Sequence, residues 1–230
     1  MEGELDRNIF DLPDLRNQIH VFQDREHAGL TLSKMLEVYK DSNAVVFGIP
    51  AGGVPVAAPI ARQLKLVLDV VVVNKVTLPW NTEAGYGAVS FEGTVHLNQD
   101  MLSGMGLTSE DINDGVQKAS RKVKRRLKKF RKGLSFPDVK DSSVILVDDG
   151  VASGFTMLVA VEALKNKGAE KIIIAVPTAH LQALKRVSSK VEQIYCANLR
   201  GGWGFAVADA YQNWYDVDEQ EVTEILDKFR

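Results

Sequence analysis

Two adjacent carboxylates, Asp148 and Asp149, follow an apolar run and begin the segment where chemistry is most concentrated in this sequence. The residues that follow them are Gly150, Val151, Ala152, Ser153, Gly154, Phe155 and Thr156. At the start of a helix, unpaired N–H groups, hydroxyls and the positive end of the helix dipole attract a phosphate. Carboxylates only accept hydrogen bonds, so the acid pair suits neighbouring hydroxyls of a sugar. A turn with an aspartate N-cap is the simpler alternative, but it uses one carboxylate and no hydroxyl. The segment therefore predicts a binding loop for a phosphorylated sugar.

Short apolar runs rich in valine and isoleucine are the predicted strands that must position this loop. They cover residues 43–49, 68–74, 143–147, 171–176 and 193–199. Helical patterns alternate with them: one follows a candidate N-cap at Asp24, and two others cover residues 53–63 and 156–167. This alternation predicts an α/β fold with an open, mostly parallel twisted sheet flanked by helices. In such sheets ligands bind at the carboxyl ends of the strands.

Composition narrows the class of protein. The 230 residues are 45% hydrophobic and 25% charged, which is ordinary for a globular chain and argues against a disordered or fibrous one. No apolar run approaches the roughly 20 residues of a membrane span, and no linker divides the chain, so we expect one domain over residues 1–230 and no membrane partner. Cys196 is the only cysteine, and residues 1–6 contain no apolar stretch, so a cytoplasmic location without a signal peptide is expected.

One segment concentrates positive charge. Residues 118–132 hold ten basic residues and no acid, whereas the rest of the chain has 18 basic against 30 acidic residues. Apolar residues from Ile112 to Phe130 recur at helical spacing, which predicts a long helix with the basic residues on its wet face. A solvated helix face is the simpler interpretation, and a contact with a polyanion such as RNA is the alternative.

Residues 144–156, Val-Ile-Leu-Val-Asp-Asp-Gly-Val-Ala-Ser-Gly-Phe-Thr, resemble the signature of the phosphoribosyltransferases. Other motifs resemble a subgroup of predicted, uncharacterised members of that family. They are Phe22-x-Asp-Arg-x-x-Ala-Gly29, Gly48-Ile-Pro-Ala-Gly-Gly-Val-Pro-Val56, Gly87-Ala-Val89 and the segment 211–224. The resemblance covers the chain from about Phe22 onward. It implies the type I fold of this family with a small hood, and leaves residues 1–21 as an N-terminal extension.

The resemblance also implies an activity: Mg²⁺-dependent transfer of a phosphoribosyl group from 5-phosphoribosyl-1-diphosphate (PRPP) to a nitrogenous base, with release of diphosphate. Asp148 and Asp149 would then contact the ribose hydroxyls, and residues 150–156 would hold the 5-phosphate. A second loop, formed by Pro50, Ala51, Gly52 and Gly53, would hold the diphosphate through backbone N–H groups. Lys75, after another strand, would add a cation. An ordinary turn and a surface lysine are the simpler alternatives for these residues. Magnesium would be held mainly by the substrate.

Two positions depart from the pattern of the subgroup, and a third narrows the choice of base. The subgroup usually carries arginine where this chain has Ala51, which removes a cation from the diphosphate loop and puts turnover in doubt. Ser153 stands for the usual threonine. Enzymes acting on 6-oxopurines carry an acid at the position of Ala152, so this chain resembles the adenine-type enzymes there.

A hood over the base is expected from residues 77–97 and 199–217. The aromatic residues Trp203, Phe205, Tyr211 and Trp214 are candidates to stack on the base, with core packing as the alternative.

A different class of function stays open. A catalytically weak protein on the same fold could sense PRPP or a nucleotide while binding RNA through residues 118–132. A phosphoacceptor receiver domain fits poorly, because the acid pair lies two-thirds along the chain and not after a first strand. A homodimer is expected by analogy with the family alone.

Overall fold

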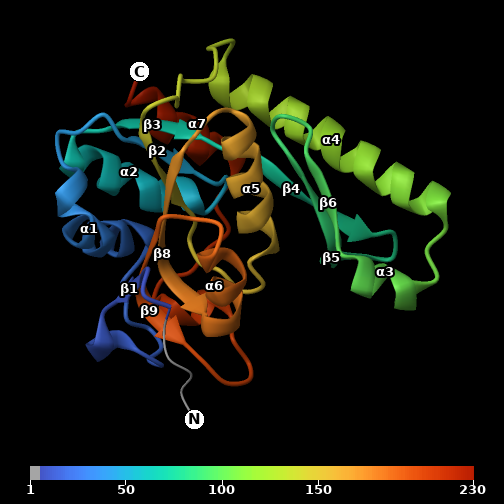
Figure 1. The fold of residues 1–230 in the computed structure, drawn as a ribbon, viewed down its shortest axis with the longest axis horizontal. Helices are drawn as coiled ribbons and strands as arrows, with labels where there is room; N and C mark the ends of the chain where they lie inside the picture. Colours follow the sequence, from blue (N-terminus) through green and yellow to red (C-terminus); the bar gives the residue numbers. More distant parts are fainter. Residues whose placement is uncertain (1–5) are drawn as a thin grey trace.

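The computed structural model describes residues 6–230, and for residues 82–84, 100 and 101 it places the backbone alone. Its main feature is a six-stranded sheet in the order β1-β9-β8-β7-β2-β3, with every neighbouring pair parallel (Figure 1). The strands are β1 (Ile9–Asp11), β2 (Val45–Gly48), β3 (Val67–Val70), β7 (Ser143–Val147), β8 (Lys171–His180) and β9 (Gln193–Arg200). This arrangement confirms the predicted open parallel sheet.

Helices cover both faces of the main sheet, because alternate side chains of each strand point to opposite sides. Ile145 and Val147 of β7 pack toward α1 (Arg25–Met35), α2 (Gly53–Leu64) and α7 (Glu219–Asp227). Their neighbours Val144 and Leu146 pack toward α5 (Phe155–Asn166) and α6 (Leu181–Ser188). Because both faces are buried, the central strands are continuous apolar runs rather than alternating ones.

A smaller antiparallel sheet lies beside the main one (Figure 1). It consists of β4 (Val73–Leu78), β5 (Asn81–Ser90) and β6 (Val95–Leu97), followed by α3 (Gln99–Met105) and α4 (Ser109–Arg131). A capping box between Thr108 and Asp111 starts α4, and its apolar stripe buries Ala119, Val123 and Phe130. The predicted long amphipathic helix is confirmed.

The apolar run 68–74, predicted as one strand, is divided between the two sheets. Val70 ends β3 in the main sheet, and the backbone N–H of Val71 donates to the carbonyl of Gly48. From Val73 the chain pairs with β5 instead. Val71 and Val72 are fully buried because the crossing runs through the core, so they look like strand interior in the sequence.

Two segments at the predicted periphery form regular strands. Residues 9–11, inside the predicted N-terminal extension, form edge strand β1 against β9, with Ile9 opposite Ile194. Residues 77–97, expected in the hood, form most of the small sheet, whose Tyr86 and Val89 pack with α4 residues. Within residues 6–230, every helix is too short or too polar to cross a bilayer.

Candidate functional site

The two predicted binding loops meet at the carboxyl ends of neighbouring strands. Strands β2 and β7 pair in register from Val45 opposite Val144 to Gly48 opposite Val147, so the segments that follow them lie together. A Cβ atom on Gly52 would lie 1.9 Å from Oδ2 of Asp149. A Cβ on Gly53 would lie 2.6 Å from the carbonyl oxygen of Val147. The glycine pair is therefore needed for the close approach of the two loops.

The acid pair is partly used by the protein itself. Oδ1 of Asp148 accepts from the backbone N–H of Asp149 at 2.9 Å. Oδ2 of Asp149 accepts from Nε and Nη2 of Arg25 at 3.0 and 2.9 Å. In the described part of the chain, no N–H or hydroxyl group donates to the second carboxylate oxygen of either aspartate. Each acid thus keeps one acceptor for a ligand.

Burial and charge act in opposite directions on these acids. Burial raises the pKa of Asp148 well above its usual range, and the neighbouring Asp149 raises it further. Burial also raises the pKa of Asp149, whereas Arg25 lowers it through charge and hydrogen bonding. Lys75, exposed on β4, is close enough to lower the pKa of Asp148. The fold therefore brings the predicted cation toward the predicted acids.

The loop of residues 150–156 offers several free backbone donors. Helix α5 begins at Phe155, after Gly154 with φ of +79°. For Ala152, Ser153, Gly154 and Thr156, no acceptor for the backbone N–H occurs among residues 6–230. Such a cluster at a helix start fits a phosphate.

Val151 differs from the rest of this loop. Its N–H donates to the carbonyl of Thr178 at 3.0 Å, and its own carbonyl accepts from the N–H of His180 at 2.9 Å. Because these bonds extend the pairing beside β8 and the side chain is buried, Val151 cannot bind phosphate as predicted.

The loop of residues 50–53 has fewer donors than predicted. The N–H of Gly53 donates to the carbonyl of Ile49 at 3.0 Å, and Pro50 has no N–H. The N–H groups of Ala51 and Gly52 have no acceptor in the part of the chain that the structure describes. The peptide bond between Pro50 and Ala51 is cis. Two of the four predicted residues can therefore present a backbone donor to an anion.

Two of the predicted base-stacking residues contact Asp149 or its partner Arg25. Tyr211 is 2% exposed, and its hydroxyl donates to the backbone carbonyl of Asp149 at 2.6 Å. The ring of Trp214 lies over the guanidinium of Arg25, with 4.0 Å between Cζ and the ring centroid. A buried ring cannot stack on a base, so the prediction is wrong for Tyr211.

The other two aromatic candidates line a cavity of about 550 Å³ at the strand ends. Its lining residues are Ala152, His180, Gln182, Gly202, Trp203, Gly204 and Phe205. Trp203 is fully exposed, and Phe205 packs edge-on against His180. The lining contains no lysine, arginine, aspartate or glutamate. Because Ala152 belongs to the phosphate loop, this cavity adjoins the predicted sugar site.

Sequence reasoning missed the role of Arg25. Arginine is rarely buried, and its position at the start of a helix suggests a surface residue. The available signal was its place in the motif of residues 22–29, which lies far from the acid pair along the chain. Helix α1 packs on the main sheet, and this packing brings the motif of residues 22–29 next to the acid pair.

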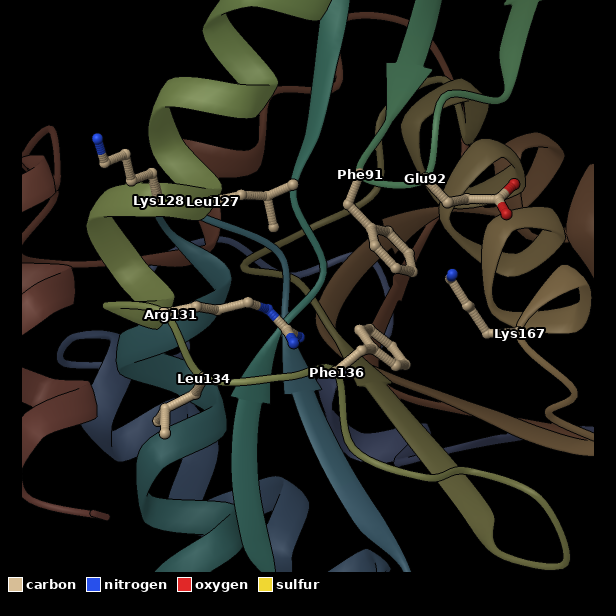
Figure 2. Close-up of a pocket in the computed structure, with 9 residues that line it drawn as sticks. Phe91, Glu92, Leu127, Lys128, Arg131, Leu134, Phe136 and Lys167 are labelled. Carbon is tan, nitrogen blue, oxygen red and sulfur yellow. The ribbon is translucent and has the colours of Figure 1, made fainter.

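A different cavity, of about 340 Å³, lies near the C-terminal ends of α4 and α5 (Figure 2). The parallel rings of Phe91 and Phe136, with centroids 4.8 Å apart, form one side of it. Arg131 lies over Phe136, but it pairs with Asp69 at 3.1 Å and donates to the carbonyl of Val70. Both of these bonds are made by Nη2, while the buried Nε of Arg131 has no hydrogen-bond partner among the described residues. No predicted site residue lines the cavity, so the contacts of Arg131 serve to join α4 to the main sheet.

Four of the ten basic residues in 118–132 pair with acids of α7. Arg125, Arg126 and Lys129 all contact Glu219, at 2.9, 3.3 and 3.3 Å, and Lys132 contacts Asp227 at 2.6 Å. This pairing explains part of the basic segment as an internal contact between two helices.

Comparison with known proteins agrees with this geometry. A model of the phosphoribosyl transferase domain matches residues 24–210. A protein of Mycobacterium tuberculosis H37Rv named "Putative phosphoribosyl transferase Rv0571c" is 32% identical over 208 residues, or 90% of this chain; its counterpart in strain CDC 1551 matches equally. The chain spans about half of those relatives, 47% of their length.

A solved structure shares the fold over most of its length. The protein TT1426 from Thermus thermophilus is 32% identical, with a TM-score of 0.72 over 90% of this chain and 98% of the other. The match to the domain model includes both loops and the acid pair. The chain therefore belongs to the phosphoribosyltransferase family.

Proposed function

We propose that this protein transfers a phosphoribosyl group from PRPP to a nitrogenous base and releases diphosphate. The observation that carries the proposal is the meeting of the acid pair with two loops of free backbone donors at the ends of β2 and β7. One loop fits a phosphate, the other a diphosphate, and the carboxylates between them fit the ribose hydroxyls.

Different residues of the site are proposed to bind different parts of PRPP. The free oxygens of Asp148 and Asp149 would accept from the two ribose hydroxyls, and the N–H groups of residues 152–154 and 156 would hold the 5-phosphate. Ala51 and Gly52 would donate to the diphosphate, with Lys75 as the nearby cation. In the reaction the C1–O bond to diphosphate breaks and a C1–N bond to the base forms, while the base loses its proton to solvent. Positioning and electrostatic stabilisation suffice, and no protein nucleophile is required.

Magnesium would enter with the substrate. Among the described residues no group of three or more histidine, cysteine, aspartate or glutamate side chains could hold a metal ion. The ion is proposed to be carried by diphosphate oxygens, where it would neutralise the charge of the leaving group.

The acceptor is proposed to be an uncharged ring. The lining of the cavity that holds Ala152, Trp203 and Phe205 contains no formally charged side chain. Arg200 lies over the ring of Phe205 but is paired with Asp209, so a base that carries a carboxylate would find no unpaired cation there. Ala152 also offers no carboxylate to the exocyclic groups of a 6-oxopurine. An uncharged heterocycle such as adenine is therefore the first acceptor to test.

Release of diphosphate from Mg·PRPP across a panel of bases tests this function. Release that depends on one added base would establish the transfer and identify the acceptor. The panel should include adenine, hypoxanthine, guanine, uracil and an acidic base such as orotate. Release with orotate alone would contradict the proposed uncharged base pocket. No release with any base of the panel would contradict the proposed transferase activity.

Ala51 supports a second candidate, a PRPP or nucleotide sensor. A loop with two free N–H groups and no arginine can bind an anion without strongly stabilising a leaving group. Binding of Mg·PRPP without base-dependent release would favour this sensor. The pairing of α4 with Glu219 and Asp227 weakens the argument for RNA as its partner.

A further inference from the structure

Arg25 connects the acid pair to the C-terminal segment. Its side chain is 4% exposed, and two of its N–H groups are used by Oδ2 of Asp149. Nη1 donates to the backbone carbonyl of Tyr215 at 2.9 Å. The side chain of Arg25 therefore contacts Asp149, a residue proposed to bind the substrate, and also holds the segment of residues 211–215.

Aromatic rings enclose the guanidinium on the side of that segment. Its Cζ lies 4.0 Å from the ring centroid of Trp214, 5.3 Å from that of Tyr215 and 5.7 Å from that of Tyr211. Aromatic faces attract a cation and exclude water, which strengthens the bond of Arg25 to Asp149. Tyr211 adds a hydrogen bond to the carbonyl of Asp149, so the main chain and side chain of this aspartate are both fixed.

We propose that Arg25, enclosed by residues 211–215, is a positioning residue that keeps Asp149 ionised and turns its free oxygen toward the ribose. The inference rests on the proposed function. It makes the order of the C-terminal segment a determinant of substrate affinity, because loss of the enclosure exposes Arg25 to water and loosens the acid.

The charges around the pair give this arginine its importance. Burial raises the pKa of both acids, and the charge of Asp149 further opposes ionisation of its neighbour Asp148. The titratable groups that interact with the two acids or with Arg25 are Lys75 from β4 and Tyr211 and Tyr215 from the C-terminal segment. Asp24, the N-cap of α1, and Glu221 of α7 act on Tyr215. Of the two cations, only Arg25 is hydrogen-bonded to a carboxylate of the pair in the described structure. Without it, the pair would retain a proton to higher pH.

Arg25→Gln and Arg25→Lys test the proposal, with Arg62→Gln as the matched control. Arg62 and Arg25 both line a surface cavity between α1, α2 and α7, but the acidic partner of Arg62 is Glu26, at 3.9 Å. Mg·PRPP affinity is measured by calorimetry from pH 5 to 9. We expect Arg25→Gln to weaken binding at neutral pH by about tenfold or more and to move the acid limb of the profile upward by about 1–3 pH units. Arg25→Lys should recover part of both effects, and Arg62→Gln should match the parent protein.

A titration of ¹³C-labelled aspartate carboxyl groups by NMR gives a readout that needs no substrate. The pKa of Asp149 should rise in Arg25→Gln and stay unchanged in Arg62→Gln. If the parent protein binds no PRPP, the proposed function fails, and the NMR titration still tests whether Arg25 keeps Asp149 ionised.

A lower Tm of Arg25→Gln, with no change in either the pH profile or the pKa of Asp149, would overturn the proposal, since loss of a purely structural arginine would do the same. If Arg25→Gln does not fold, Trp214→Leu, which removes only the covering ring, should still weaken Mg·PRPP binding; parent-like affinity in that variant would also overturn it.

Discussion

Arg25 and Asp149 lie 124 positions apart in the sequence, yet two N–H groups of the arginine converge on one carboxylate oxygen. The asymmetry matters, because no N–H or hydroxyl group of the described residues donates to the other oxygen of Asp149. Charge compensation and ligand binding thus use different atoms of the same side chain. A free acceptor beside a compensated charge is what recognition of a sugar hydroxyl requires.

The first prediction concerns the acid pair. Asp148→Asn combined with Asp149→Asn should lower Mg·PRPP affinity at least tenfold, because each charge-assisted hydrogen bond contributes about 1.5–3 kcal/mol. Calorimetry on protein with an unchanged circular dichroism spectrum measures this. Asp114→Asn, at an exposed position on α4, is the control. Parent-like affinity in the folded double variant would remove the pair from the site.

A second prediction follows from the raised pKa of Asp148. A carboxyl with a higher pKa in the folded state costs stability as pH rises above about 3.9, since the folded state gives up its proton less readily. Asp148→Asn should therefore be more stable than the parent at pH 7, with the gain shrinking toward pH 4. Each kcal/mol should move the Tm by about 2–4 °C in a chain of this size. An equal difference at both pH values would contradict the assigned cause.

The glycine at the contact of the loops gives a third prediction. Gly52→Ala places a Cβ 1.9 Å from Oδ2 of Asp149, so the Asp149 carboxylate, which Arg25 holds in place, or one of the loops must move. We expect a loss of about 1–3 kcal/mol in the free energy of unfolding, together with loss of PRPP binding. Gly104→Ala in α3 is the matched control, because its Cβ meets nothing within 4 Å and alanine favours the helix. Urea denaturation of both variants measures the difference, and similar behaviour of the two would show that the contact is not tight.

The fourth prediction separates internal pairing from polyanion binding on α4. Arg125→Glu with Arg126→Glu puts acids against Glu219 and should cost about 1–2 kcal/mol of stability. Lys118→Glu with Lys122→Glu, on the exposed face, should change stability by about 0.5 kcal/mol or less. Urea denaturation tests both pairs. Equal losses would contradict the helix contact.

RNA retention on a filter is informative only with the second pair. A steep fall in retention with salt, removed by Lys118→Glu and Lys122→Glu, would show that the exposed residues bind a polyanion. Loss of retention in the first pair alone would be explained by a loosened α7.

Local sequence determined the central strands, the helices between them and the two loops. Strong periodicity and glycine placement act over a few residues, so 143–147 and 156–167 could be located almost to the residue. The run 68–74 could not be divided, because valines buried in either of two sheets have the same pattern. Strand β1 was missed because three residues give too short a pattern.

Tertiary structure alone decided which atoms of the site are available. The sequence identified residues 150–156 as one loop, but pairing with β8 uses the donor and acceptor of Val151. It identified Tyr211 as an aromatic near the site, but packing buried the ring and left the hydroxyl to bind Asp149. Arg25 reaches the acid pair only because α1 packs beneath the sheet. Residue types and spacing fix what chemistry a segment can do, whereas burial and hydrogen bonds between distant segments fix which groups remain free to do it.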